Sequence, residues 1–424
     1  MSDEHFVPAM AAPPTRRDNP LTRSLAGLIG LATLAIIMLA CFATIPWTFA
    51  APPNPDGTPG MVRRYEAGDP SHARMPPEWW PTDTQTQRHI IEIAPPEARD
   101  QAAETIATDQ GLTAQSVLTS SDPEIISALA KSLADYKPHF ALGSDALGRS
   151  LLVRILVGGT ISIGVGISAA LISVFIGTLY GATAGYIGGR LDALMMRVVD
   201  ILYGLPYILL VVLIAVAADG AIDRWQRSAI ATASAERQAW VEEQVSQSPD
   251  PETARPEIEA TAATMFTTGE LSGGQRAAID VLALLIAIGG VSWLTMARVV
   301  RGQVLSLKAQ PFVESARAIG APAPWIFSRH LLPNLLGPII VYATLTVPQA
   351  ILQESFLSFL GIGIKPPLPS WGNLAADGLS ELNRHRSHWW LLFFPCLMLG
   401  VTLLSLNFVG EGLREAFDPK RARK

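Results

Sequence analysis

One stretch of the chain has the residue types of a nucleotide site. Residues 143–150 (GSDALGRS) nearly match a phosphate-binding loop, but Arg149 stands where that loop needs a lysine. Such a loop also follows a β-strand, and residues 136–139 (YKPH) do not read as a strand. We therefore expect no nucleotide site here. The segment is better interpreted as a polar lead into the apolar stretch that follows it.

A second polar stretch, residues 311–334 (PFVESARAIGAPAPWIFSRHLLPN), lies between two long apolar runs. Its first proline suits the start of a helix, and Glu314 lies in the first turn, where a negative charge favours the helix dipole. Gly320 falls where that helix would end, Pro324 opens a second short helix, and Pro333 closes it. The pattern predicts a helix, a glycine break and a helix on the water side of a membrane. Periodicity alone fits an interfacial hairpin without a partner equally well.

The composition is that of a membrane protein. Hydrophobic residues make up 49% of the 424 positions, charged residues make up 16%, and the mean hydropathy is +0.29. Such values fit several membrane spans. Cys41 and Cys396 lie in apolar runs, so we expect two buried thiols and no disulfide or metal pair. No basic stripe with interleaved aromatic residues indicates a nucleic-acid partner, and no cluster indicates a bound metal or cofactor.

Six apolar stretches are candidates for helices that cross a bilayer of about 30 Å. They are residues 25–47, 151–179, 194–217, 279–297, 335–360 and 389–409. Pro206 predicts a kink in the third. Four glycines spaced four apart, from Gly177 to Gly189, would share a helix face and admit another backbone, with loop glycines favoured for the pair at 188–189. The sequence predicts an all-α, polytopic membrane protein with six transmembrane helices.

Polar segments separate these spans. They are a tail at 1–24, an insert with the lead segment at 48–150, a second insert at 219–278, the loop at 308–334 and a tail at 413–424. We expect the first insert to form a small, mostly helical module in which Asp122 or Ser121 caps a helix. In the second insert we expect a helix that ends at residues 248–251.

Short basic loops predict the orientation of the chain. With a cytoplasmic N-terminus, the basic residues placed inside are Arg190, Arg197, Arg298, Arg301, Lys308, Arg317, Arg329, Lys420, Arg421, Arg423 and Lys424. Both inserts then fall outside, where acidic residues outnumber basic ones. The 308–334 loop and both termini would face the cytoplasm.

The residues of this loop resemble a known family. Glu314-Ser315-Ala316, Gly320, His330 and Leu332-Pro333-Asn334 are similar in order and spacing to the EAA loop of ABC importer permeases, with Ser315 in place of the usual alanine. The subfamily that the chain resembles is that of the C-type permeases of dipeptide and oligopeptide importers, over about residues 139–218 and 280–418. In that family the loop is a coupling helix that docks on a separate ATPase subunit.

The resemblance implies roles for individual residues. It assigns coupling to the ATPase to Glu314, Ser315, Ala316, Gly320, Arg329, His330, Pro333 and Asn334. Glu314 would form a charge-assisted hydrogen bond with a basic group of the ATPase. Arg329 and His330 would brace the second short helix against the membrane core.

Three other segments resemble the same family. Residues 143–150 are similar to its LGTDxLGRD segment, and residues 365–373 to its PPxPSWG outer loop, for which a plain proline-rich linker is the alternative. Arg197, Asp200 and Pro206 match its MRxxDxxxxxP pattern. Arg197 and Asp200 are three residues apart, and we favour a structural ion pair between them on one helix face.

Residues 271–275 (LSGGQ) match the signature motif of ABC ATPases. That motif works only with a phosphate-binding loop on a partner domain, and this stretch lies in a loop expected outside the membrane. A turn before the fourth span is the better interpretation. ATP and magnesium would then be bound by partner ATPase subunits and not by this chain.

Several polar side chains lie within or beside the spans, where charged groups usually face protein or water. The candidates for lining a translocation path are Asp200, Gln349, Gln353 and Glu354. For the last three, hydrogen bonding to an adjacent loop is an equal alternative.

The resemblance implies a non-enzymatic permease subunit of a bacterial inner membrane that moves peptides, or a similar small solute, by alternating access. Nickel and opine importers look alike at this level. The implied partners are a homologous B-type permease, two cytoplasmic ATPases, an extracytoplasmic solute-binding protein and the lipid bilayer. A membrane-anchored sensor or scaffold that binds ligands through the inserts is the alternative, although it needs no ATPase-docking hairpin. An intramembrane enzyme would need a nucleophile or metal cluster, and none is visible.

Overall fold

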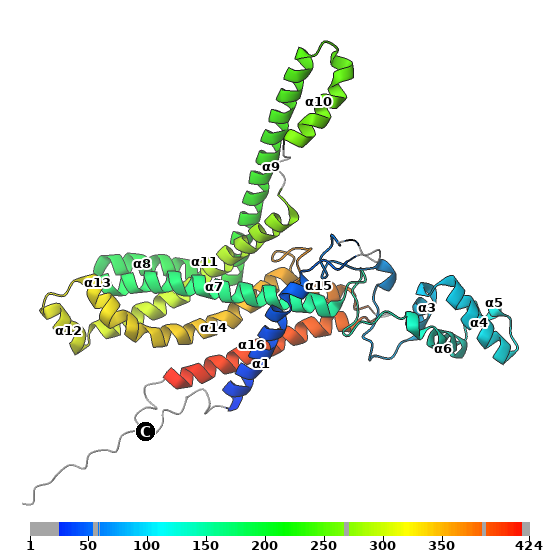
Figure 1. Ribbon diagram of the computed structural model, residues 1–424. Coiled ribbons are helices and arrows are strands. Elements are labelled where there is room, and N and C mark those ends of the chain that lie inside the picture. Colours follow the sequence, from blue (N-terminus) through cyan, green and yellow to red (C-terminus); the bar gives the residue numbers. More distant parts are fainter. Residues whose placement is uncertain (1–24, 54–57, 59, 267–270, 384–386, 418–424) are drawn as a thin grey trace, which may run out of the picture.

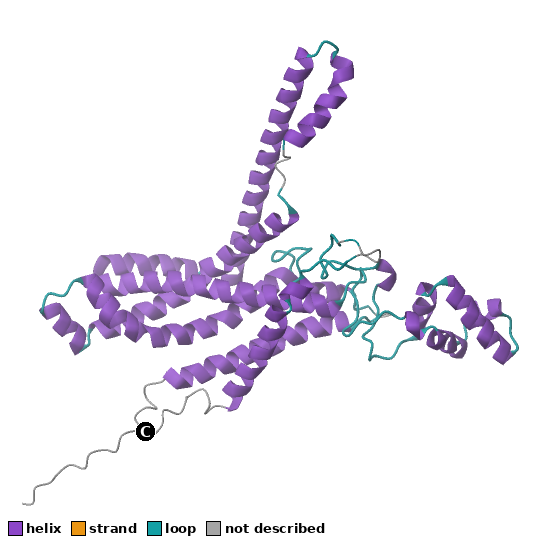
Figure 2. Ribbon diagram, in the orientation of Figure 1, coloured by secondary structure: helices purple, strands orange, loops and turns teal. Residues whose placement is uncertain are grey.

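The structure is a computed structural model that describes residues 25–53, 58, 60–266, 271–383 and 387–417. Its regular elements are helices (Figures 1 and 2), and the described residues contain isolated bridges but no β-strand. The prediction of an all-α protein is confirmed. The tail predicted at 1–24 and the basic residues from Lys420 onwards lie outside the described residues.

Five of the described helices are long and apolar enough to cross a membrane. They are α1 (Leu25–Ala43), α7 (Leu151–Ile187), α11 (Gly273–Lys308), α14 (Leu332–Phe359, continuous with the short helical turns before it) and α16 (Trp390–Phe417). A sixth span is added if α8 (Gly189–Tyr203) and α9 (Tyr207–Gln247) count as one bent span. The count agrees with the predicted polytopic fold.

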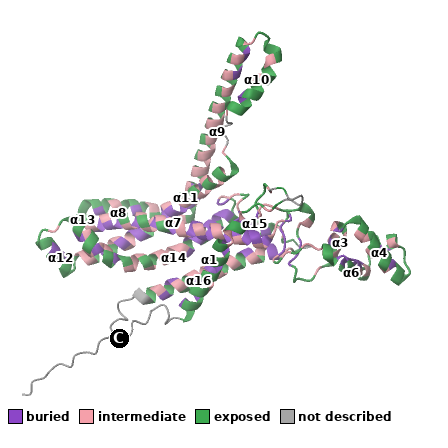
Figure 3. Cartoon of the chain, in the orientation of Figure 1, coloured by how far each residue is buried: buried purple, intermediate pink, exposed green. Residues whose placement is uncertain are grey.

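Helices α7 and α11 form the centre of this bundle, where buried residues concentrate (Figure 3). A Cβ atom added at Gly177 would lie 2.5 Å from Met296 of α11, and one added at Gly181 would lie 2.2 Å from the Ala297 carbonyl oxygen. Only glycine therefore permits this approach, and the predicted glycine face is confirmed. Gly188 and Gly189 have φ angles of 71° and 63° and form the turn between α7 and α8, as favoured from the sequence.

The third predicted span is broken rather than kinked. The axes of α8 and α9 differ by 89° across residues 204–206. Pro206 has an extended ψ of 114° that ends the helical path, and its fixed φ of −56° suits the start of a new helix. Helix α9 then runs without interruption to Gln247 and forms a hairpin with α10 (Pro251–Met265) that projects from the bundle (Figure 1). The break predicted at 248–251 is confirmed.

The first insert forms the small helical module that the sequence predicts. After α2 (Ile45–Thr48), its elements are η2 (Pro70–His72), α3 (Thr84–Ile93), α4 (Pro96–Gln110), α5 (Ala114–Leu118), α6 (Pro123–Ser132) and η3 (Ala134–Tyr136). Asp122 caps α6 by accepting a hydrogen bond from the Glu124 amide at 2.9 Å. Ala103, Leu129 and Leu133 belong to a separate apolar core. The α3–α6 part of the module lies at one end of the molecule and the 311–334 stretch lies at the other (Figure 1).

Residues 365–373 lead into a further helix, α15 (Trp371–Ser380), and are not a plain linker. Ser370 and Asn373 form a reciprocal capping box at its start. Trp371 is fully buried, and its indole Nε1 donates to the Ile155 carbonyl of α7 at 3.1 Å. Helix α15 packs against α14 and α16 and so fixes the outer loop to the bundle.

Candidate functional site

The 311–334 stretch forms a helical hairpin beyond the ends of the long helices (Figure 1). Its elements are α12 (Pro311–Ala318), α13 (Ala323–Ile326) and the π-helical turn η4 (Phe327–Leu331), which runs directly into α14. Gly320 has a φ of 81°, so the predicted glycine break is confirmed. The prediction that Pro333 closes the second helix is wrong. The Leu332 amide bonds five residues back to Phe327, and in this wide turn the proline ring and its missing N–H are accommodated at the start of α14.

One face of α12 is fixed to the bundle. Val313 and Ala316 are buried in a cluster with Ile326, Leu331 and Val304, which come from the rest of the hairpin and from α11. Ala316 therefore belongs to the core and does not lie on a docking surface. Burial of this face makes the hairpin a firm extension of α7, α11 and α14.

The other face of α12 is open. Glu314 and Ser315 are exposed, and the Ser315 hydroxyl donates back to the Pro311 carbonyl at 2.8 Å. Two large apolar side chains of this segment are also exposed, Phe312 at 41% and Ile319, just after α12, at 81%. Neither residue was predicted from the sequence. Their spacing of seven, which places them on one helix face, was the available signal.

The second half of the hairpin is held by ring contacts. The His330 ring lies 5.8 Å from that of Phe312 and 5.1 Å from that of Trp325. The Asn334 amide donates to the His330 carbonyl at 2.6 Å. His330 therefore braces α12 against η4, whereas Arg329 and Pro333 are exposed.

Ion pairs tie α8 to α11 behind the hairpin. The Asp192 carboxylate accepts two hydrogen bonds from Arg301, at 2.5 and 2.6 Å. Lys308, the last residue of α11, donates to the Tyr186 and Gly185 carbonyls at the end of α7. A cation at this position satisfies carbonyls that a helix end leaves open. The end of α7 and the first turn of α8 are therefore linked to the helix that leads into the hairpin.

The predicted ion pair between Arg197 and Asp200 is not observed. Asp200 accepts instead from Arg298 of α11 at 2.8 Å, and the Arg298 guanidinium lies 4.0 Å from the centre of the Tyr203 ring. Asp200 thus pairs with a neighbouring helix and not within its own helix, because α8 packs alongside α11.

The four candidates for the translocation path occupy different environments. Gln349 is exposed, and the Gln353 amide oxygen accepts from the Tyr207 hydroxyl at 2.8 Å. Glu354 is fully buried and accepts from Ser358 at 2.7 Å, while Ser358 also accepts from the Ile364 amide of the outer loop. The bonds of Glu354 thus support its alternative role as a tether for an adjacent loop. Gln349 has the accessibility that a path residue needs.

The two nucleotide-like motifs have structural roles here. Ser272 caps α11 in a reciprocal pair with Gln275. In the 143–150 segment, the Asp145 carboxylate accepts from Arg149 at 2.7 Å and from Arg154 at 2.5 Å. Burial raises the pKa of Asp145, but the two guanidinium groups outweigh that effect and hold the pKa below its ordinary value. The segment thus fixes the loop before α7 to the first turn of that helix.

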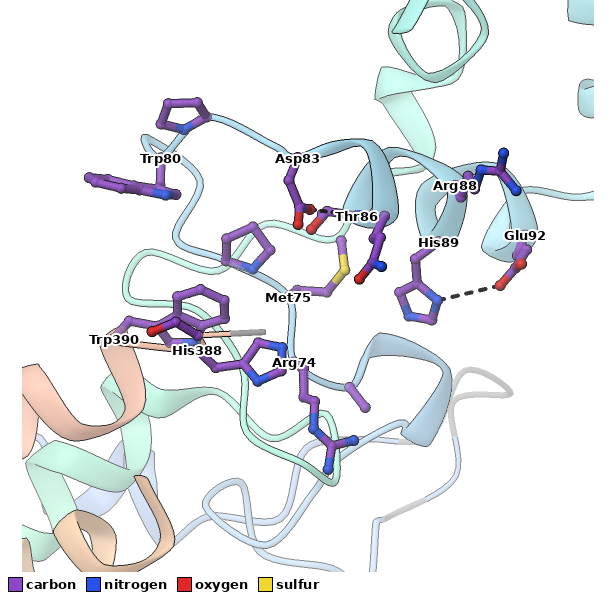
Figure 4. A pocket seen from close by; sticks show the side chains of 15 residues that line it. Arg74, Met75, Trp80, Asp83, Thr86, Arg88, His89, Glu92, His388 and Trp390 are labelled. Carbon is purple, nitrogen blue, oxygen red and sulfur yellow. Dashed lines mark hydrogen bonds and ion pairs between the residues drawn. The ribbon is translucent and has the colours of Figure 1, made fainter. Parts of the chain in front are cut away.

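A hollow of about 730 Å³ lies between α3 and the residues just before α16. Figure 4 shows Arg74, Asp83 and His89 around it. Arg74 donates twice to Glu381, at 2.7 and 2.8 Å, and these bonds lower the pKa of Glu381 below its ordinary value of 4.5. Asp83 is used as the cap of α3. The hollow thus lies where an ion pair ties the first insert to the segment between α15 and α16.

Comparison with known proteins identifies the family. Residues 173–423 match the family model of the binding-protein-dependent transport system inner membrane component. The chain belongs to this family. It is similar to the oligopeptide transport system permease protein OppC of Haemophilus influenzae, with 41% identity over 282 residues, or 66% of this chain and 70% of that protein.

Two further relatives have comparable coverage. The oligopeptide transport system permease protein OppC of Escherichia coli is 40% identical over 293 residues, or 69% of this chain and 76% of that protein. The dipeptide transport system permease protein DppC of Bacillus subtilis is 38% identical over 281 residues, or 66% of this chain and 69% of that protein. The family resemblance drawn from the EAA-like loop is confirmed, and this inner membrane component is a permease subunit.

Proposed function

We propose that this permease subunit moves peptides across the inner membrane as one half of an ATP-driven importer. The main support is the 311–334 hairpin, which buries one face of α12 in the bundle and leaves Glu314, Ser315 and Ile319 open to a partner. The relatives named above are oligopeptide and dipeptide permeases, which favours peptides as the cargo.

In this proposal the open face of α12 docks on a cytoplasmic ATPase subunit. Two such subunits bind ATP and magnesium, and this chain binds neither. Ile319 and Phe312 supply an apolar anchor, Glu314 supplies a charge-assisted hydrogen bond, and Gly320 sets the angle of the hairpin. A movement of the ATPases then reaches α7, α8 and α11 through the buried face of α12 and the Asp192–Arg301 pair.

The hairpin and both termini lie in the cytoplasm in this proposal, and both inserts lie outside. The first insert and the hairpin occupy opposite ends of the molecule, which supports such an arrangement (Figure 1). A homologous B-type permease completes the pore. A solute-binding protein delivers the peptide at the outer end, and alternating access carries it past residues such as Gln349.

The test is whether the apolar anchor of α12 holds the ATPases. In the complete transporter reconstituted in liposomes, Ile319→Asp should weaken ATPase retention and reduce peptide uptake together, because a charge replaces a desolvated contact. Leu112→Asp is the matched control, since Leu112 is also exposed, at 43%, but lies in the first insert. Full ATPase retention and uptake in Ile319→Asp would refute the docking assignment.

A further inference from the structure

Aromatic side chains gather where the first insert meets the start of α16. This aromatic patch consists of Trp79, Trp80, Trp389, Phe393 and Phe394. The ring of Trp80 lies 4.8 Å from that of Trp389, and the ring of Trp79 lies 6.3 Å from Trp389 and 6.4 Å from Phe394. Residues more than 300 positions apart in the sequence thus form one surface cluster.

The part of the chain that the structure describes leaves the patch open. Trp79 is 59% exposed, Trp80 is 43% exposed and Phe393 is 49% exposed. Phe393 also begins an exposed apolar stripe along α16, which continues through Leu397 and Leu404 with the spacing of one helix face. Because α16 is a candidate membrane span, the patch continues its apolar surface at the end of the span.

The Trp79–Trp80 turn is firmly held in this position. The Trp79 indole Nε1 donates to the Ala141 carbonyl at 2.9 Å, just ahead of the start of α7. Arg74 binds Glu381, which precedes α16, and the Glu381 side chain is partly shielded from solvent. Figure 4 shows Trp80 and Trp390 on the same side of the hollow between these segments. These bonds hold the turn level with the first residues of α7 and α16.

We infer that the aromatic patch lies in the headgroup layer of the outer leaflet and anchors the first insert to the membrane surface. Tryptophan is favoured there because its ring is apolar while its N–H can meet polar groups. The lipid interface is the occupant because the patch is continuous with the exposed stripe of α16. The α3–α6 module is then held beside the outer opening, at a fixed height above the bilayer.

This inference rests on the proposed placement of α16 across the membrane, so the test contains a separate reference for that placement. Cys396, which the sequence predicted to be buried, is exposed on α16, and a fluorescent thiol label there, in a Cys41→Ala background, reports the span. In a Cys41→Ala/Cys396→Ala background, Pro81→Cys places the label beside Trp80 and keeps both tryptophans. Glu104→Cys, exposed on α4 of the same module, is the matched control.

The labelled transporters are reconstituted in phosphatidylethanolamine–phosphatidylglycerol vesicles that carry a nitroxide on the headgroup or in the middle of the acyl chain. The label at 81 should be quenched by the headgroup nitroxide, the label at 104 by aqueous iodide only, and the label at 396 by the acyl-chain nitroxide. The Trp79→Ser/Trp80→Ser change should remove most of the lipid quenching at 81.

Two outcomes would overturn the inference alone, and a third would overturn it together with the proposed span. Iodide quenching alone at 81, with Cys396 still quenched from the acyl chain, refutes the membrane anchor and leaves the proposed topology intact. Loss of iodide quenching at 81 only after a solute-binding protein is added assigns the patch to that protein instead. A label at 396 that the acyl-chain nitroxide does not reach would refute the proposed span itself.

Discussion

Gly320 is the residue on which the angle of the 311–334 hairpin depends most directly. Its φ of 81° is strained for any residue with a Cβ, although among the described residues, apart from its two chain neighbours, none has an atom within 4 Å of the place where a Cβ would be. Gly320→Val should therefore cost about 1–2 kcal/mol through the backbone alone and re-aim α12. We expect a protein that inserts and pairs with its sister subunit but loses transport-linked ATP hydrolysis, measured beside uptake in liposomes. Gly320→Asn should be milder, because asparagine tolerates this conformation, and normal uptake in Gly320→Val would contradict the coupling role.

For single residues, the sequence predicted correctly those roles that depend on neighbours in the chain. Gly320 and Asp122 were identifiable because a helix break and a helix cap depend on neighbouring residues only. Which residues of α12 are buried and which are exposed could not be identified, since that depends on how α12 packs against α11 and α14. Ala316 thus proved buried, and Ile319 was overlooked although it is 81% exposed.

At the scale of elements, the Asp192–Arg301 pair connects α8 to α11. The two side chains are 11% and 33% exposed, so neither charge is fully hydrated if its partner is removed. We expect Asp192→Asn and Arg301→Gln each to lower uptake per ATP hydrolysed, and the exchange Asp192→Arg/Arg301→Asp to recover part of it. A double-mutant cycle on complex stability should give a coupling of about 1 kcal/mol or more. Arg298→Gln is the control, because the Asp200–Arg298 pair is more exposed and should matter less. Equal effects at the two pairs would refute a special role for the Asp192–Arg301 pair.

The element scale also shows what periodicity leaves open. Pro206 correctly marked a disturbance, but the 89° angle between α8 and α9 is set by how both helices pack against α11. Pro333 was assigned as a stop because proline usually ends a helix, and the wide turn of η4 that accommodates it has no simple sequence signature. Apolar length alone was sufficient for the positions of α1, α7, α11, α14 and α16.

At the scale of the whole molecule, the α9–α10 hairpin projects from the side of the bundle, away from α12 (Figure 1). Its own small core holds it together, with Val241 and Val245 of α9 packed near Ala262 of α10. At its base, Arg276 of α11 binds Asp223 at 2.6 Å and Gln226 at 2.9 Å. The chain segments that enter and leave the hairpin are therefore adjacent, and a short linker can join them.

This geometry allows a clean deletion. Replacing residues 229–269 by a short glycine–serine linker keeps Asp223, Gln226 and Arg276 and so keeps the contact between α9 and α11. We expect normal membrane insertion and normal ATPase association, because the described helices of the deleted part pack against each other and lie away from α12 (Figure 1). Peptide uptake should fall at low concentrations of solute-binding protein and recover as that concentration rises, because an outer contact surface has been lost. Copurified ATPase and uptake against binding-protein concentration are the measurements. Loss of the ATPase would show that the hairpin supports the cytoplasmic end, and an unchanged uptake curve would show that it does not contact the binding protein.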